Sequence, residues 1–317
     1  MRSRVDKMPI RNMGTLLENI VLVETMRLLA QGNQERQPID LLNSFAMPPL
    51  SGWCAHRTDY GFSAAQLNAL LVGPQAAPAD SYQAMLWSCL QQPSGEPGTL
   101  GPNGALLCSI LAQHLSCPIR LWLNDIPHGH YGNALPGLAA INATVQRVLA
   151  LTVAPQNVVV VCEDPWPDCL RINLSDTLAN WEDKPHARIG FLDPMRYRVN
   201  NGAAGETDSA SHLEWLRLLS DGMACPVISV HFTGHNDWQT LRPEIEQMHA
   251  DGRAKGYLHT LVARHSYYHA VCNVKAPQGS EASRALARDL QRVLEAAWGG
   301  WFTTTGRMPD GLTIEVL

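Results

Sequence analysis

Apolar and polar positions along the chain follow two alternating patterns. Short apolar runs bounded by polar or turn residues are typical of buried strands, and longer segments with helical periodicity lie between them. Five runs are expected to form strands: Pro38–Asn43, Ile119–Asn124, Val158–Cys162, Arg188–Leu192 and Val227–Phe232. Because strands joined by helices form right-handed crossover units, these five strands should pair in parallel.

The pattern changes in the last third of the chain. The runs Tyr257–Ala263 and Tyr268–Val274 are separated by only a few residues, too few for a crossover helix, so they should form an antiparallel hairpin. A helix over Ser280–Trp298 and a short strand over Leu312–Val316 follow. The sequence thus predicts an α/β fold with a seven-stranded, mostly parallel sheet and Pro38–Asn43 in its middle.

Helices are expected before and between these strands. The first covers Met13–Ala30 and stops at Gly32. Others are expected at Gly104–Leu115, Gly137–Leu149, Pro167–Trp181 and Ser211–Ser220. Residues 45–104 are richer in Pro, Gly and polar residues, with two short helices expected at Ser63–Leu71 and Ser81–Leu90. We interpret residues 1–317 as a single domain in which 45–104 is a helical insertion.

Composition narrows the class of protein. With 317 residues, 45% hydrophobic and 17% charged, the chain should be globular, and its net charge of −5 gives no global attraction for nucleic acid. A nucleic-acid contact would need a local patch or a partner subunit. Eight cysteines without a C-x-x-C pair suit a reducing compartment. With no signal-peptide core and no uncharged membrane-length segment, we expect a cytoplasmic protein without membrane contact.

The most informative motif follows the strand Arg188–Leu192. This strand runs directly into Asp193-Pro194, and Tyr197 comes three residues later. At the carboxyl end of a parallel strand, this pair places a carboxylate and a carbonyl over the crevice where such sheets bind ligands. Together with an aromatic side chain, they are suited to hold an exocyclic amine of a nucleobase. An ordinary Asp-Pro turn is the alternative.

Other candidate residues follow the remaining strand ends. Asn43 and Phe45 come at and after the end of the first strand, and Asp125 and Asp164 follow the second and third. Asp176 lies in the segment before the fourth. An ionised carboxylate there can accept two strong hydrogen bonds, for example from ribose hydroxyls. Each of these acids could instead be a capping or surface residue.

The order and spacing of these features resemble class I S-adenosylmethionine-dependent methyltransferases. The resemblance is to the large-subunit ribosomal RNA adenine-N6 methyltransferases and to the three-Cys-motif partner proteins. It is carried by five segments: Leu17–Leu22, Ile39–Pro49, Gly101–Leu107, Leu123–Ile126 and Phe191–Tyr197. It implies a Rossmann-like sheet, S-adenosylmethionine as cofactor, and methyl transfer to a nucleobase amine of the N6-adenine type.

The resemblance also implies roles for individual residues. Asp193 and the Pro194 carbonyl would orient the amine beside Tyr197. Asn43 and Phe45 would lie at the cofactor turn, with Asp125 on the ribose. Either Asp164 or Asp176 would lie near the adenine of the cofactor.

The chain departs from these families in two places. Met47, Pro48 and Pro49 stand where the families have a glycine turn, which lets the backbone approach the cofactor closely. The families also have an acid at the end of this strand, where this chain has Asn43, and Asp40 does not replace that acid because it faces the opposite side of the strand. Glu18 and Asn19 stand where the RNA-modifying family has a Lys-His pair.

Two other functions stay open. One is a catalytically inactive scaffold that binds a nucleic-acid or protein partner, which the altered turn favours. The other is a metal-dependent hydrolase using the histidine pairs His128/His130, His231/His235 and His265/His269. The last two pairs have i,i+4 spacing, which makes a ligand face only on a helix, so we expect no metal. The oligomeric state does not follow from the sequence.

Overall fold

The computed structural model describes residues 13–43, 115, 117–124, 159–162, 184–192, 213, 215–220, 223–234, 238–265, 268–305 and 312–317. Within these ranges, eight strands form one sheet in the order β3-β2-β1-β4-β5-β7-β6-β8. The strands are β1 (Ile39–Asn43), β2 (Ile119–Asn124), β3 (Val159–Cys162), β4 (Ala187–Leu192), β5 (Val227–Gly234), β6 (His259–His265), β7 (Tyr268–Lys275) and β8 (Thr313–Val316). The structure gives the bounds of three helices: α1 (Met13–Ala30), α9 (Trp238–Ala254) and α10 (Ser280–Thr305).

The directions of the strands confirm the predicted mixed sheet. Strands β1 to β5 pair in parallel, with β1 between β2 and β4. Strand β7 is antiparallel to both β5 and β6, so the expected hairpin is present and β6 runs parallel to β5. Strand β8 pairs with β6 and extends the sheet to eight strands, where seven were expected. Strand β6 begins at His259, two residues later than predicted.

Helix α9 was not predicted from the sequence. It follows β5 and leads to β6, and this crossover is what makes β6 parallel to β5. Its apolar residues Leu241, Ile245 and Met248 have i, i+4, i+7 spacing and pack on Val262 and Val271 of the sheet. The apolar spacing alone predicts an amphipathic helix. Pro243 weakens that prediction, because proline inside a helix usually interrupts it.

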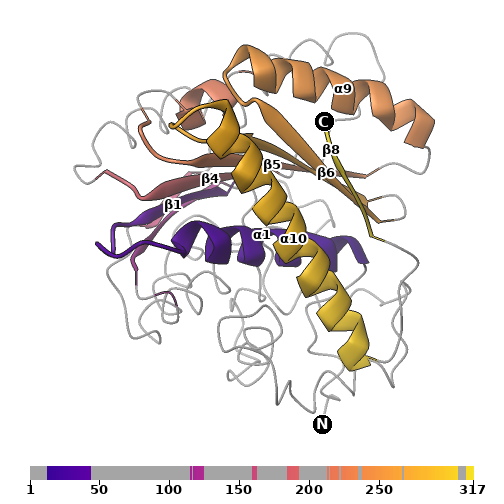
Figure 1. Cartoon of the computed structure of the whole chain (residues 1–317), viewed down its shortest axis with the longest axis horizontal. Helices are drawn as coiled ribbons and strands as arrows, with labels where there is room; N and C mark the ends of the chain where they lie inside the picture. Colours follow the sequence, from indigo (N-terminus) through magenta and orange to yellow (C-terminus); the bar gives the residue numbers. More distant parts are fainter. Residues whose placement is uncertain are drawn as a thin grey trace.

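The two faces of the sheet are covered by different helices. Helices α1 and α10 lie on one face and α9 lies on the other (Figure 1). The face under α1 and α10 holds the main core, where Leu41, Ile189 and Val230 of the sheet pack with Val23 and Leu290 of these helices. Because strand side chains alternate, the residues between these core positions point toward the α9 side.

The helix ends match the prediction at one end of the chain better than at the other. Helix α1 has the predicted bounds, and Gly32 follows it at φ 78°, a conformation that glycine adopts without steric cost. Helix α10 extends to Thr305, past the predicted end at Trp298. The 45–104 insertion and the helices expected between residues 125 and 181 lie outside the described residues. Among the described helices, none is long and apolar enough to cross a membrane.

Candidate functional site

The carboxyl ends of the central parallel strands lie side by side. Asn43, the last residue of β1, is opposite Leu123 of β2 and Phe191 of β4. Neighbouring strands are about 5 Å apart, so these ends can contribute to one binding site. From β1 the chain builds outward through β2 and β3, then returns to β4 on the other side of β1. Open α/β sheets bind ligands at such a switch point.

Most of the predicted site residues are in segments that follow the described strands. Phe45, Asp125, Asp164 and Asp176 lie outside the described residues, as do Asp193, Pro194 and Tyr197. For Asn43 the backbone alone is described, at the end of β1 beside the switch point. Their convergence on one ligand therefore stays a prediction. The structure does establish that β1, β2 and β4, the strands preceding most of them, are neighbours in the sheet.

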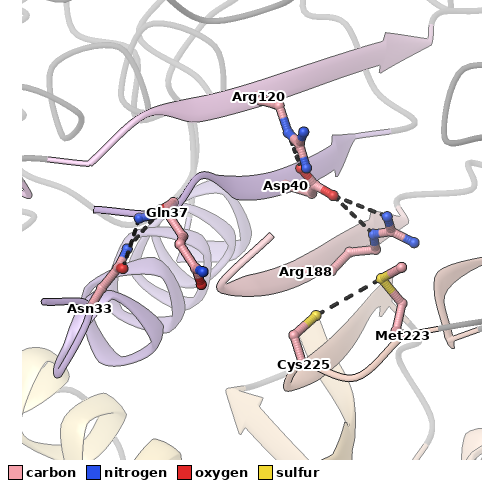
Figure 2. Close-up of polar contacts among 7 residues, drawn as sticks. All are labelled: Asn33, Gln37, Asp40, Arg120, Arg188, Met223 and Cys225. Atoms are coloured by element: carbon pink, nitrogen blue, oxygen red, sulfur yellow. Dashed lines mark hydrogen bonds and ion pairs between the residues drawn. The ribbon is translucent and has the colours of Figure 1, made fainter. Parts of the chain in front are cut away.

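The best-defined polar cluster lies at the opposite end of these strands. Asp40 sits between Arg120 and Arg188 on the two neighbouring strands (Figure 2). Its Oδ1 accepts from Arg120 Nε at 2.6 Å, and its Oδ2 accepts from Arg188 Nη2 at 3.0 Å and Nε at 3.2 Å. All three side chains are buried. The cluster thus joins β2, β1 and β4 near their amino ends.

The cluster places two guanidinium groups around one carboxylate. Burial raises the pKa of Asp40, while Arg188 and Arg120 act in the opposite direction through their charges and hydrogen bonds. Arg188 Nη1 also donates to the carbonyl of Leu219 at 3.3 Å, near the end of the helical residues 215–220. Because the Asp40 carboxylate is held by both arginines, we assign it a structural role and not that of a cofactor ligand.

The described cysteines are buried thiols. Cys117, Cys225 and Cys272 are free. Burial raises the pKa of Cys225 to about 11 and that of Cys272 to about 12. Cys225 Sγ lies 3.9 Å from Met223 Sδ (Figure 2). Since the thiolate is the reactive form of cysteine, these raised pKa values favour the unreactive thiol form of Cys225 and Cys272 at neutral pH.

A second polar network lies between α9 and the strands β6 and β7. Thr260 Oγ1 donates to Asn273 Oδ1 at 2.8 Å and lies 2.9 Å from His249 Nδ1. Because the Thr260 hydroxyl donates its proton to Asn273, its oxygen is the acceptor in the bond with His249, and His249 Nδ1–H is the donor. Gly252 of α9 lies so close that an added Cβ would be 2.5 Å from Asn273 Oδ1. The network therefore fixes α9 against β6 and β7.

Of the three histidine pairs, His265/His269 is the one that lies wholly within the described residues; His128, His130 and His235 lie outside them. His265 is on the α10 side of the sheet, with its ring centroid 5.2 Å from that of Trp298. Alternation along the hairpin places His269 on the α9 side, the same side as His231. The i,i+4 pair His265/His269 is thus divided between two faces. In the described parts of the chain, no group of three or more His, Cys, Asp or Glu residues could hold a metal ion.

No family model and no curated protein matches this sequence. Function therefore has to be inferred from the fold and from the residues themselves.

Proposed function

We propose that this protein is an S-adenosylmethionine-dependent methyltransferase-like protein that acts on a nucleobase amine of the N6-adenine type. The observation that carries the proposal is the switch point between β1 and β4. The residues after these two strands include Phe45 on one side and Asp193, Pro194 and Tyr197 on the other. A ligand at the switch point would lie between the two groups.

The sheet order supports a methyltransferase more than a nucleotide-binding dehydrogenase. A dinucleotide-binding sheet has six parallel strands in the order 3-2-1-4-5-6. Here an antiparallel strand, β7, is inserted between β5 and β6. Five parallel strands followed by an antiparallel pair is the shape of the class I methyltransferase sheet.

In this proposal the protein catalyses transfer mainly by positioning. S-adenosylmethionine supplies the methyl group. Asp193 and the Pro194 carbonyl hold the acceptor amine in line with it, and Tyr197 stacks on the base. Asp125 accepts from the ribose hydroxyls. In-line placement contributes more to such a transfer than acid-base chemistry does.

Calorimetry with S-adenosylmethionine tests the cofactor half of the proposal. We expect Asp125→Ala to weaken binding by about 1.5–3 kcal/mol, the typical contribution of hydrogen bonds to a charged group. Asp289→Ala is a matched control, because Asp289 is a partly exposed acid on α10 that is paired with Arg292. Asp193→Ala should abolish methyl transfer to adenosine-containing acceptors and leave cofactor affinity nearly unchanged.

The inactive scaffold is the second candidate function. It is favoured by Met47, Pro48 and Pro49, which fill the turn where the families have glycines and remove two backbone donors. The same titration separates the candidates. No heat of binding at millimolar S-adenosylmethionine would exclude the methyltransferase proposal and leave the scaffold.

A further inference from the structure

Basic side chains gather where α9 ends, β6 begins and β7 ends. Arg253 lies in the last turn of α9, Lys255 follows the helix, and Lys275 is the last residue of β7. Lys275 Nζ donates to the Lys255 carbonyl at 3.4 Å, so the two segments are in contact. We call Arg253, Lys255 and Lys275 the basic corner. It is notable in a chain whose net charge is −5.

In the part of the chain that the structure describes, neighbouring acids do not neutralise the cations of the basic corner. Within the described ranges, no carboxylate forms an ion pair with any of the three. By contrast, Arg242 of the same helix pairs with Glu246 at 2.9 Å. The one acid inside the last turns of α9, Asp251, is buried and accepts from Gln247 at 2.7 Å.

Stabilisation of the helix end accounts for only part of this charge. A helix C-terminus carries about half a negative charge, and basic side chains near it are favourable. Three cations exceed that half charge several times over. Of the three cations, Arg253 also acts on a neighbouring side chain, because burial, then Arg253 and then His259 lower the pKa of His249. The corner therefore has a positive field beyond what α9 requires.

An exposed apolar side chain lies within the basic corner. Leu258 is 37% exposed, and in the described part of the chain Val316 is the one other large hydrophobic residue with a side chain this exposed. His259 pairs with Val274 across the hairpin, so Leu258 lies beside Lys275. Tyr257, the neighbouring aromatic residue, is fully buried and offers no face for a base to stack on.

We propose that the basic corner and Leu258 bind an acidic segment of a partner protein. Carboxylates of the segment pair with Arg253, Lys255 and Lys275, and an apolar residue among them contacts Leu258. A protein segment fits better than nucleic acid. A long polyanion would extend past the corner toward a protein surface of net negative charge, whereas a short segment is attracted within about 8–10 Å, the range of charge interactions in physiological salt.

The place of this surface makes it independent of the proposed methyltransferase site. Strand β6 begins and β7 ends at the amino ends of the parallel strands, opposite the edge where β1 and β4 end. A partner bound at the corner leaves the switch point open. The proposal therefore stands whether the chain is an active enzyme or a scaffold.

Fluorescence anisotropy with a labelled synthetic peptide tests the proposal. The probe is a short peptide with one leucine flanked by glutamates, titrated with the full chain at low salt and at high salt. We expect salt-sensitive binding that the double variant Arg253→Glu/Lys255→Glu weakens at least tenfold. Arg284→Glu/Arg288→Glu makes the same charge change at two exposed residues of α10 and should leave binding nearly unchanged. Leu258→Ser should weaken binding without changing its salt dependence.

Three results would overturn the proposal. The first is no binding of the peptide at millimolar protein. The second is equal loss in the two double variants, which would show attraction to total charge and not to this corner. The third is tighter binding of a single-stranded oligonucleotide of equal charge that depends on Arg253 and Lys255, which would make the corner a nucleic-acid surface. Circular dichroism of each variant excludes unfolding as the cause of a loss.

Discussion

The two faces of the sheet use the same strands and are stabilised in different ways. Under α1 and α10, Leu41, Ile189 and Val230 contribute only apolar contacts. On the α9 side, the intervening positions carry Asp40 and Arg188, together with the hydrogen-bonded residues Ser229, Thr260 and Asn273. The apolar face depends on the area removed from water. The polar face also has an apolar cluster around Val262 and Val271, and it depends in addition on each buried polar group keeping its specific partner.

This difference has a consequence for how each face responds to change. Loss of one methyl group on the apolar face leaves its neighbours in place and costs little. Loss of one partner on the polar face leaves a buried charge or donor without compensation. Substitutions of similar size should therefore have unequal effects on the two faces.

The largest effect is expected at the charge cluster. Asp40→Ala leaves Arg120 and Arg188 buried without their carboxylate, and we expect it to lower the free energy of unfolding by about 3–5 kcal/mol. Urea denaturation followed by circular dichroism measures this. The triple variant Asp40→Leu/Arg120→Met/Arg188→Met removes all three charges and should recover most of the loss. A loss below 1 kcal/mol in Asp40→Ala would contradict the expected cost of leaving Arg120 and Arg188 buried without this carboxylate.

The next effect is expected where α9 approaches the polar network. Gly252→Ala would place a Cβ 2.5 Å from Asn273 Oδ1, which forces the Thr260–Asn273 hydrogen bond apart. We expect a loss of about 1–3 kcal/mol, as for other overpacked sites. Gly299→Ala is the matched control, because Gly299 is also helical and has nothing within 4 Å of its added Cβ. It should stabilise α10 by roughly 0.5–1 kcal/mol. Equal responses in urea would contradict the close contact.

The sequence predicted the apolar face better than the polar face. Runs such as Ile119–Asn124 gave β2 with its observed bounds, since hydrophobic burial is encoded locally. The pairing of Asp40 with Arg120 and Arg188 joins residues 80 and 148 positions apart, and local patterns carry no information on such pairs. The available signal was a single charged residue near the start of each of three otherwise apolar strands.

The sequence predicted where in the sheet the candidate site lies, but not how its side chains are arranged. The predicted parallel sheet with Pro38–Asn43 in its middle is confirmed, and the position of β1 between β2 and β4 defines the switch point. Side-chain roles for Asp125 or Asp193 depend on loops after the strands, whose conformation is set by distant contacts and by ligands. The missed helix α9 shows the same limit at a smaller scale, because Pro243 obscured an otherwise readable apolar spacing.

A smaller effect is expected on the apolar face. Ile189→Val removes one methylene from a fully buried side chain, and we expect a loss of about 0.5–1.5 kcal/mol. The loss should be the same at low and high salt and at pH 6 and pH 8, because no charged group is involved. Urea denaturation under the four conditions measures this. A loss that varied with salt or pH would show that the two faces are coupled through the sheet.

The smallest effect on stability is expected from the protonation of His249, which depends on pH and not on the size of a side chain. Burial, with Arg253 and His259, lowers its pKa in the folded protein below the ordinary value of 6.5. The folded state therefore binds the proton less tightly than the unfolded state. The resulting contribution to stability is fully present above pH 6.5 and is lost as pH falls through the lowered pKa of the folded state.

The variant His249→Gln separates this contribution from the rest. Its amide can still donate toward Thr260 but does not titrate, so the fall in unfolding free energy below pH 6.5 should be shallower than in the unmodified protein. Chemical denaturation at half-unit steps from pH 5 to pH 8 measures both curves. The apolar-face variant Ile189→Val should run parallel to the unmodified protein throughout. If His249→Gln also ran parallel, the proton would be taken up elsewhere, and the α9 network would contribute hydrogen bonds alone.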